Sequence, residues 1–256
     1  MLSRNQLRHI HSLKQKKFRE VHHQFLAEGS KLVLDILESP YKVLAVYALA
    51  GWLKRNENLL LSKKVPFTEI QEGEMDKITA LSTPSPALAI TEIPATPPLP
   101  VLVNDLILVL DDIRDPGNLG TIIRIADWFG IGSIVCSENT VDLYNPKVIQ
   151  ATMGSVTRIR VNYCNLPEFL SSLDPAINIY GTFPEGENIY SARLDPKGVI
   201  LIGSESSGIS PEVVSKVTDR ISIPSYTAAA GRDHAESLNA SIATAIVCSE
   251  FRRRKR

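Results

Sequence analysis

The stretch DDIRDPGNLGTIIRIADWFG, residues 111–130, follows directly on a run of apolar residues and sets the pattern for the second half of the chain. The Asp-Pro-Gly at 115–117 is typical of a turn, and Asn118 is a favourable residue to cap a helix. The spacing of apolar residues then predicts a helix over 119–129 that Gly130 stops. A strand, a turn and a helix in this order indicate a unit of an α/β fold.

The same alternation of apolar runs and helical segments continues to the end of the chain. Continuous apolar strands joined by helices predict a parallel sheet that is covered by helices on both faces. In such sheets the ligand lies outside the carboxyl ends of the strands, so the loops after the strands are the candidate site. The predicted strands are residues 106–112, 133–137, 158–161, 178–183, 198–205 and 220–224.

The first part of the chain predicts a second, smaller α/β domain. Residues 30–37 and 51–60 have helical spacing, whereas 42–50 and 87–93 read as strands. A proline-rich stretch follows, which favours an extended path without backbone donors. We therefore expect three parts, whose boundaries are 1–93 for the small domain, 94–100 for the linker and 101–256 for the large domain.

Composition excludes several classes of protein. A hydrophobic share of 44% with a formal net charge of +0 is that of a globular protein and not of a disordered one. The three cysteines lie far apart and lack the spacing of a zinc site, which predicts reduced thiols and no metal. No apolar run is long enough to span a bilayer, and the first residues lack the apolar core of a signal peptide. We therefore expect a cytoplasmic protein with no membrane contact.

Both ends of this neutral chain are basic, and the first stretch also carries four histidines. Such runs can be solvated surface, but two of them favour an anionic partner such as nucleic acid. The cations are Arg4, Arg8, Lys14, Lys16, Lys17, Arg19 and Lys31 near the start and the RRRKR sequence at the end.

Three loops after strands carry unusual polar residues. Arg124 is expected near the start of its helix, where a cation is unfavourable unless an anion binds there, although a solvated surface arginine is the simpler alternative. Glu205 lies in the small-residue loop 203–208, where it either contributes to a site or only caps the next helix. Ser237 and Asn239 open the long C-terminal helix. The spacings of a P-loop, a dinucleotide-binding glycine motif and a serine hydrolase are absent.

Taken in order, these loops resemble the three signature motifs of the SpoU (TrmH-type) RNA 2'-O-ribose methyltransferases of the SPOUT class. The first motif is Asn118-x-Gly120-x-x-x-Arg124-x-Ala126, and the second is Gly203-x-Glu205-x-x-Gly208. The third is Ile223-Pro224 followed by Glu236-Ser237-Leu238-Asn239-x-Ser241. The chain departs from the family pattern at Ser206, where glycine is common, and in a long loop over 225–235.

The resemblance implies a deep trefoil knot, bound S-adenosylmethionine, no metal, and a homodimer whose active site uses both subunits. It also implies that the small first domain binds the RNA substrate, with ribosomal RNA favoured over transfer RNA. Carried over by motif, the residues expected to form the polar reaction site are Asn118, Arg124, Glu205, Ser237 and Asn239. The residues expected to contact the cofactor are Gly203, Ile223, Leu238 and, from the GTFPEG stretch, Thr182.

Methyl transfer from a sulfonium to a ribose hydroxyl requires alignment and the removal of one proton. A guanidinium is almost never deprotonated, so we expect Arg124 to hold an RNA phosphate and stabilise the developing alkoxide, with base catalysis as the alternative. Two other readings of the chain remain open. One is an RNA-binding or ribosome-assembly protein without activity on the same fold, and the other is a nicotinamide-dependent oxidoreductase, which the missing glycine motif disfavours.

Overall fold

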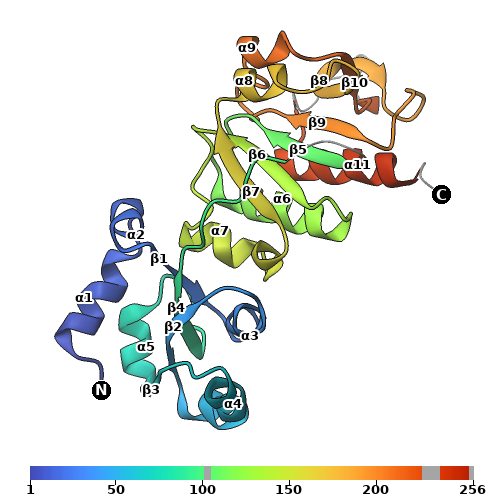
Figure 1. Ribbon diagram of the computed structural model, residues 1–256. Coiled ribbons are helices and arrows are strands. Elements are labelled where there is room, and N and C mark those ends of the chain that lie inside the picture. The colour runs from blue at the N-terminus through green and yellow to red at the C-terminus, as the bar shows by residue number, and fades with distance from the viewer. Residues whose placement is uncertain (101–104, 227–236, 254–256) are drawn as a thin grey trace. The chain divides into compact units, whose positions relative to one another are not determined.

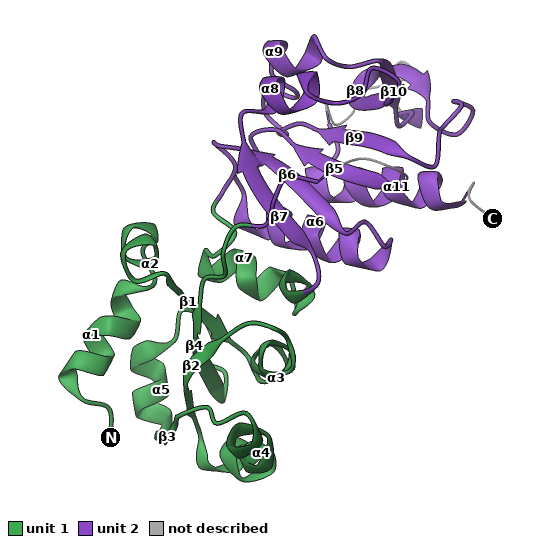
Figure 2. Ribbon diagram, viewed as in Figure 1, with its two compact units in different colours: residues 1–96, 142–157 green, residues 97–141, 158–256 purple. Residues whose placement is uncertain are grey.

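The structure is a computed structural model that describes all residues except 101–104, 227–236 and 254–256. The chain divides into two compact units (Figures 1 and 2). The first unit consists of residues 1–96 and 142–157, and the second consists of 97–141 and 158–256. Among the described residues, no helix combines the length and the apolar character that crossing a bilayer would need.

The first unit is a four-stranded sheet with helices on both faces (Figure 1). Its strand order is β1-β4-β2-β3, in which β4 runs antiparallel to both neighbours and β2 is parallel to β3. The four strands are β1 (Gln24–Glu28), β2 (Val43–Ala48), β3 (Phe67–Glu69) and β4 (Ala87–Glu92). The helices are α1 (Arg4–Ser12), α2 (Lys16–His22), α3 (Ser30–Glu38), α4 (Ala50–Ser62), α5 (Glu72–Ile78) and α7 (Pro146–Ala151).

The predicted elements of this unit are confirmed at α3, β2, α4 and β4. The pattern did not predict β1, although it is almost fully buried and pairs with β4 over its whole length. One face of the sheet packs against α1 and α5, where Ile10, Leu13, Met75 and Ile78 meet Leu88 in a shared core. Helix α1 is basic, helix α5 is acidic, and both have few apolar residues. Packing of these apolar residues in the shared core stabilises the two helices.

Residues 142–157 belong to the first unit in space, although the sequence predicted them inside the large domain. Their helix α7 packs on β1, and the ring of Tyr144 lies 4.8 Å from that of Phe25. The hydroxyl of Tyr41 donates to the carbonyl of Val156 at 3.2 Å. The domain boundary drawn from the sequence assigned this segment to residues 101–256. Apolar burial, and not position in the chain, decides which unit a segment joins.

A buried ion pair also joins this segment to the start of the chain. Arg19 is 3% exposed, and its guanidinium contacts the carboxylate of Asp142 at 2.5 Å and the carbonyl of Leu13 at 3.0 Å. Arg19 was grouped in the sequence with cations that face an anionic partner, and for this residue the grouping is wrong. Its charge is used inside the fold.

The second unit is a six-stranded, fully parallel sheet, which confirms the predicted fold class (Figure 1). Its strand order is β10-β8-β9-β5-β6-β7, so the chain runs outward in one direction and then returns to the other side of β5. The strands are β5 (Leu106–Leu110), β6 (Ser133–Ser137), β7 (Arg160–Cys164), β8 (Ile179–Asn188), β9 (Gly198–Ile202) and β10 (Asp219–Ser222).

Helices cover both faces of this sheet. Alternate residues of β5 and β9, such as Val109 and Leu201, pack against Phe169 of α8 and Val213 of α9. On the other face α6 packs beside α11, and the ring of Phe251 lies 5.0 Å from that of Tyr180. The helices of this unit are α6 (Pro116–Trp128), α8 (Leu166–Ser171), α9 (Pro211–Val214) and α11 (Ala240–Arg253). The 3-10 turn η1 (Ser155–Thr157) belongs to the first unit.

The start of α6 differs from the sequence-based prediction. The N-cap is Asp115, whose carboxylate accepts from the backbone N–H of Asn118 at 2.8 Å, and the helix already begins at Pro116. Asp115 is preferred over Asn118 as the cap because Pro116 follows it. Proline is favoured at the first helical position, where its missing N–H leaves no hydrogen bond unmade. Arg124 therefore lies eight residues beyond the first helical residue, and the argument from the helix dipole fails because that field fades within one turn.

The connection from β10 to α11 includes residues 227–236, which lie outside the described residues. Glu236 of the third motif is one of them. The trefoil knot depends on the path of this connection and stays a prediction. All three cysteines are free thiols. Burial raises the pKa of Cys248 to about 12 and also raises the pKa values of Cys136 and Cys164, so none is a ready nucleophile at neutral pH.

The first prediction concerns the buried ion pair. Arg19→Ala leaves the Asp142 carboxylate without its cation, so the free energy of unfolding should fall by about 3 kcal/mol. Lys17→Ala removes an exposed cation of the same helix and should change stability by less than about 0.5 kcal/mol. Urea unfolding followed by circular dichroism measures both, and equal effects of the two variants would contradict the structural role of Arg19.

Candidate functional site

The three motifs lie together at the carboxyl edge of the second unit's sheet. The first follows β5, the second follows β9, and the third follows β10 and begins α11. Strands β5 and β9 are neighbours, but their connections leave in opposite directions across the sheet, toward β6 and toward β10. Such a switch of direction leaves a crevice at the strand ends, which is the usual ligand position in open α/β sheets.

Glu205 connects all three motifs through one carboxylate oxygen. Its Oε1 accepts from the side-chain amide of Asn118 at 2.9 Å, from that of Asn239 at 2.6 Å and from the backbone N–H of Ala240 at 2.9 Å. The amide of Asn239 also donates to Oδ1 of Asn118 at 2.9 Å. These three predicted residues, Asn118, Glu205 and Asn239, form the polar triad, a closed set of hydrogen bonds between segments up to 121 residues apart.

Asn239 has a second task as the cap of α11. Its Oδ1 accepts from the backbone N–H groups of Ser241 at 3.1 Å and Ile242 at 3.3 Å, and from the hydroxyl of Ser241 at 2.6 Å. Glu205 therefore lies at the N-terminus of a 14-residue helix, where the dipole and the free N–H groups favour a negative charge. The alternative that Glu205 only caps the helix after its own loop is wrong, because it contacts α11 and not α9.

The loop that carries Glu205 is held rigidly at both ends. Ser204 and Gly208 exchange two backbone hydrogen bonds of 3.0 and 2.9 Å, and Gly208 has a positive φ of 67°. A Cβ on Gly203 would lie 2.3 Å from the carbonyl carbon of Gly208, so only glycine fits there. The buried carboxylate of Asp111 accepts from the backbone N–H of Ser210 at 2.8 Å and fastens the loop to the end of β5.

Arg124 is not brought to the polar triad within one chain. It lies six residues after Asn118 on α6, which places the two side chains about 120° apart around the helix axis. Its side chain is exposed and makes no hydrogen bond or ion pair with the described residues. It shares its face of the helix with Trp128, which is 84% exposed.

The residues predicted for the cofactor follow adjacent elements at the same edge. Thr182 lies where β8 leaves its pairing with β9 and donates to the carbonyl of Leu201 at 3.0 Å, Gly203 follows β9, and Ile223 follows β10. Leu238 is 46% exposed just before α11, and the neighbouring Ser237 is exposed as well. A row of backbone groups with small and apolar side chains along neighbouring strand ends is a fitting cradle for a nucleoside cofactor.

Asp111 and Ser241 are the residues of this site that the sequence did not single out for a role. Asp111 could have been found from its place at the end of the β5 run, but its partner Ser210 lies 99 residues away. Within the parts of the chain that the structure describes, no three His, Cys, Asp or Glu side chains gather as metal ligands would.

Comparison with known families agrees with this geometry. Residues 105–249 match the model of the SpoU rRNA methylase family, and these residues contain all three motifs. Residues 4–89 match the model of the MRM3-like substrate binding domain, which covers most of the first unit.

Individual proteins of known sequence or structure are similar over nearly the whole chain. A solved protein from Porphyromonas gingivalis, assigned to the TrmH family of RNA methyltransferases, is 37% identical with a TM-score of 0.86 and 99% coverage of both chains. The AdoMet-bound rRNA methyltransferase from Sinorhizobium meliloti is 29% identical with a TM-score of 0.86, covering 99% of this chain and 97% of that one.

The 23S rRNA (guanosine(2553)-2'-O)-methyltransferase RlmP of Bacillus subtilis is 28% identical over 242 residues, which are 93% of this chain and 92% of that protein. The family model, the ordered motifs and the whole-chain similarity agree with one another, and the family expected from the sequence is confirmed. The chain belongs to the SpoU rRNA methylase family.

Proposed function

We propose that the protein transfers a methyl group from S-adenosylmethionine to a ribose 2'-hydroxyl of ribosomal RNA in the cytoplasm. Membership of the family establishes that the chain is an RNA methyltransferase that uses S-adenosylmethionine. The observation that carries the finer proposal is the polar triad, in which Asn118, Glu205 and Asn239 converge at the strand ends. Mapping ribose methylation of ribosomal RNA in cells with and without the gene tests it, and an unchanged map would contradict it.

When bound, the cofactor supplies an electrophilic methyl group. The chain has to place the ribose hydroxyl in line with that methyl and exclude water from it. The triad suits this positioning task, because each of its members is fixed by at least two hydrogen bonds and cannot turn away. A rigid set of amide and carboxylate groups can hold a hydroxyl at low entropic cost.

In this proposal Arg124 holds an RNA phosphate, and it does so at a site completed by a second copy of the chain. Two features support this. Arg124 is exposed, and its side chain leaves the helix about 120° around the axis from that of Asn118. The packed helices α6 and α11 each expose a large apolar side chain, Trp128 near the end of α6 (84% exposed) and Ile242 near the start of α11 (52% exposed). Aromatic side chains such as that of Trp128 are enriched at protein interfaces.

The first unit is proposed to bind the RNA substrate. Its match to a substrate binding domain supports this, and so do the cations that remain at its surface. Arg8 and Lys17 are exposed, in contrast to Arg19. The histidine rings of α1 and α2 lie among these cations, and His9 meets His22 with ring centroids 4.9 Å apart.

The second prediction concerns Arg124. Arg124→Ala should keep the fold and the affinity for S-adenosylmethionine but lower turnover by roughly a hundredfold, as loss of one stabilising donor does in other enzymes. Arg193→Ala removes another exposed arginine of the same unit and should turn over normally. Calorimetry with the cofactor and transfer of a radiolabelled methyl group measure the two effects. Near-normal turnover of Arg124→Ala would refute the proposed role.

The shared site has its own test on the same variants. If Arg124 of one copy works with the triad of another, mixing Arg124→Ala with Glu205→Ala subunits should restore activity through mixed dimers. Each variant alone should be nearly inactive. Activity of the mixture that stays at the level of the two separate variants would show that Arg124 and Glu205 must act within one chain.

The third prediction separates the two tasks of Asn239. Asn239→Ser keeps a capping oxygen for α11 but loses the amide that donates to Asn118 and Glu205, whereas Asn239→Ala loses both. Both variants should lose methyl transfer to a similar degree. Only the alanine variant should lose the cap, at a cost of about 1 kcal/mol in thermal unfolding. A serine variant with normal turnover would mean that Asn239 serves only as a cap.

The fourth prediction concerns the surface cations of the first unit. Replacing Arg8 and Lys17 with Ala should flatten the plot of log affinity for single-stranded RNA against log salt, by about 0.7 for each phosphate that the protein no longer neutralises. The matched variant lacks Arg193 and Lys197, which are exposed cations of the second unit, and should keep the slope. Fluorescence anisotropy at several salt concentrations measures both. An unchanged slope in the first variant would mean that RNA docks elsewhere.

A further inference from the structure

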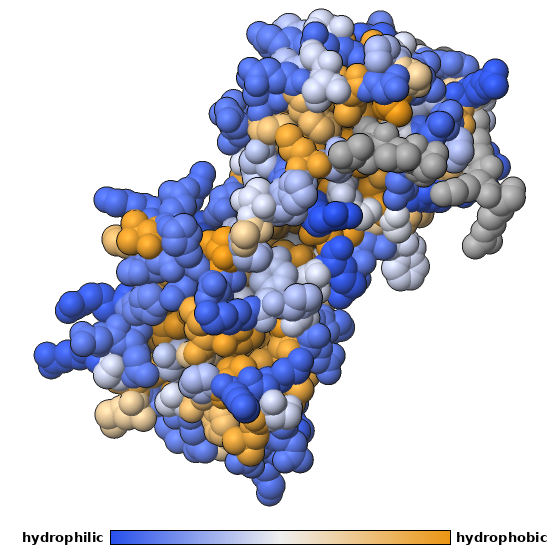
Figure 3. Space-filling view, viewed as in Figure 1, coloured by the Kyte–Doolittle hydropathy of each residue, from blue (hydrophilic) through white to orange (hydrophobic). Residues whose placement is uncertain are grey.

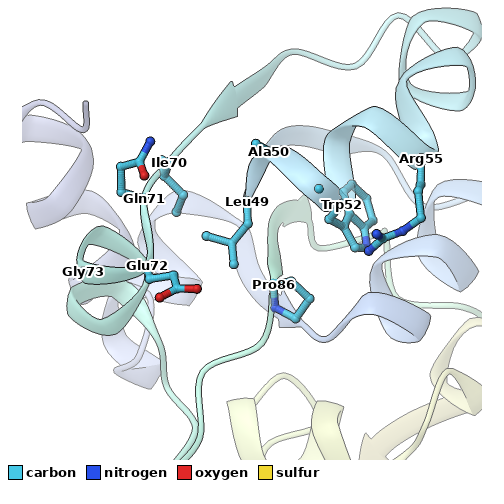
Figure 4. Close-up of a pocket in the computed structure, with 10 residues that line it drawn as sticks. Leu49, Ala50, Trp52, Arg55, Ile70, Gln71, Glu72, Gly73 and Pro86 are labelled. Atoms are coloured by element: carbon cyan, nitrogen blue, oxygen red, sulfur yellow. The ribbon is translucent and has the colours of Figure 1, made fainter.

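The first unit contains a pocket that none of the three motifs explains. It has a volume of about 570 Å³ and lies where β2 and β3 end and β4 begins (Figure 4). Figure 3 shows apolar surface over the region of α4 with hydrophilic residues around it. Leu49, Ile70 and Pro86 form apolar walls, and Arg55, Gln71 and Glu72 supply polar groups.

A buried hydrogen-bond donor in the wall of this pocket lacks a partner. Trp52 is 2% exposed, and its indole N–H has no acceptor among the described residues. Leaving such a donor unpaired costs free energy, so native proteins seldom keep one without a reason. Trp52 and Arg55 lie three residues apart on α4, and their nitrogen atoms approach the same region in the close-up view (Figure 4). The wall of the pocket therefore contains a buried donor for which the described residues supply no acceptor.

The start of α4 adds two more donors. The cap residue Leu49 has no side chain that can accept, and the N–H groups of Ala50 and Gly51 have no acceptor among the described residues. The helix has 13 residues, so its N-terminus favours an electron-rich ligand. Gly51 leaves this end open, because a Cβ there would meet only Nη1 of Arg55, at 3.8 Å.

A carboxylate in the pocket limits which ligand fits. Glu72 lies in the wall together with the amide of Gln71, so a simple anion would meet a negative charge as well as Arg55. A flat group with both donors and acceptors on its edge, and with faces for apolar contact, satisfies all of these residues. Nucleobases have this chemistry, and proteins that recognise RNA commonly take unpaired bases into such pockets.

The pocket is formed before any ligand arrives. The carboxylate of Glu28 is buried and accepts from the hydroxyl of Thr79 at 2.5 Å and from the backbone N–H groups of Ala80 and Ser85. These bonds fix the loop that leads to Pro86. A wall that is held in place lowers the entropy lost on binding.

We propose that this pocket binds an unpaired base of the RNA substrate, which the indole N–H of Trp52 and the guanidinium of Arg55 recognise. The proposal rests on the proposed function, since it makes the pocket part of substrate recognition by the first unit. It adds a base-specific contact to the salt-dependent contacts of the surface cations.

The direct test follows the indole N–H signal of Trp52 by NMR in the full chain labelled with ¹⁵N-tryptophan. The chain has two tryptophans, and a Trp128→Phe variant assigns the two signals. Nucleosides should shift the Trp52 signal, and ribose 5-phosphate and inorganic phosphate should not. An equal shift with phosphate alone would make the pocket an anion site and overturn the proposal, as would no shift with any nucleoside at millimolar concentration.

The functional test uses variants that leave the core intact. Arg55→Ala removes an exposed side chain, and Gly51→Met and Gly73→Met fill the pocket from two helices without a clash at Cβ. Each should raise KM for the RNA at least about fivefold, as removing one interaction with a base does, with kcat and cofactor affinity little changed. Asn58→Ala, which changes an exposed, uncharged residue of α4 outside the pocket, is the control.

The outcomes distinguish the two proposals. A wild-type protein that methylates RNA, with unchanged KM in all three pocket variants, would overturn the base pocket and leave the proposed function intact. A wild-type protein without methyl transfer to ribosomal RNA, whose Trp52 signal still shifts with nucleosides, would overturn the proposed function and leave the pocket as a base site.

Discussion

The carboxylate of Glu205 holds the candidate site together. Two segments that are far apart in the sequence meet on its Oε1, one through the amide of Asn118 and the other through the amide of Asn239 and the first N–H of α11. A single oxygen that accepts three N–H groups needs them to converge, and the parallel sheet provides this by ending β5, β9 and β10 at one edge. The arrangement of the strands is therefore what makes the polar triad possible.

The rigid triad and the exposed Arg124 represent two different solutions to positioning. The triad is satisfied inside one chain and needs no ligand to stay in place. Arg124 has no partner among the described residues and lies on the exposed face of α6, one turn before Trp128. In the proposed function the two kinds of group have separate tasks: the fixed triad orients the hydroxyl, and Arg124 receives a phosphate that arrives with the RNA.

The first unit uses charge inside its fold, and we propose that it also uses charge at its surface to bind RNA. Arg19 is neutralised by Asp142 in the interior and fastens a segment from the middle of the chain to the N-terminal helices. Arg8, Lys17 and Arg55 stay at the surface, where they can meet phosphates or bases. Residue type alone does not separate these uses. Burial does, since an arginine inside the fold must be paired there and cannot contact RNA.

The sequence by itself determined the α/β class, the parallel sheet and the family, because apolar periodicity and the order of short motifs are local properties of the chain. It also named a group of five polar residues, of which the structure joins Asn118, Glu205 and Asn239 by hydrogen bonds and leaves Arg124 and Ser237 apart from them. Only the tertiary structure decided that Asp115 caps α6, that 142–157 joins the first unit and that Arg19 is buried. These outcomes depend on competition between caps and on contacts across 123 residues, which no local pattern records. The unpaired indole of Trp52 was hidden for the same reason, since a missing partner becomes visible only when all neighbours are placed.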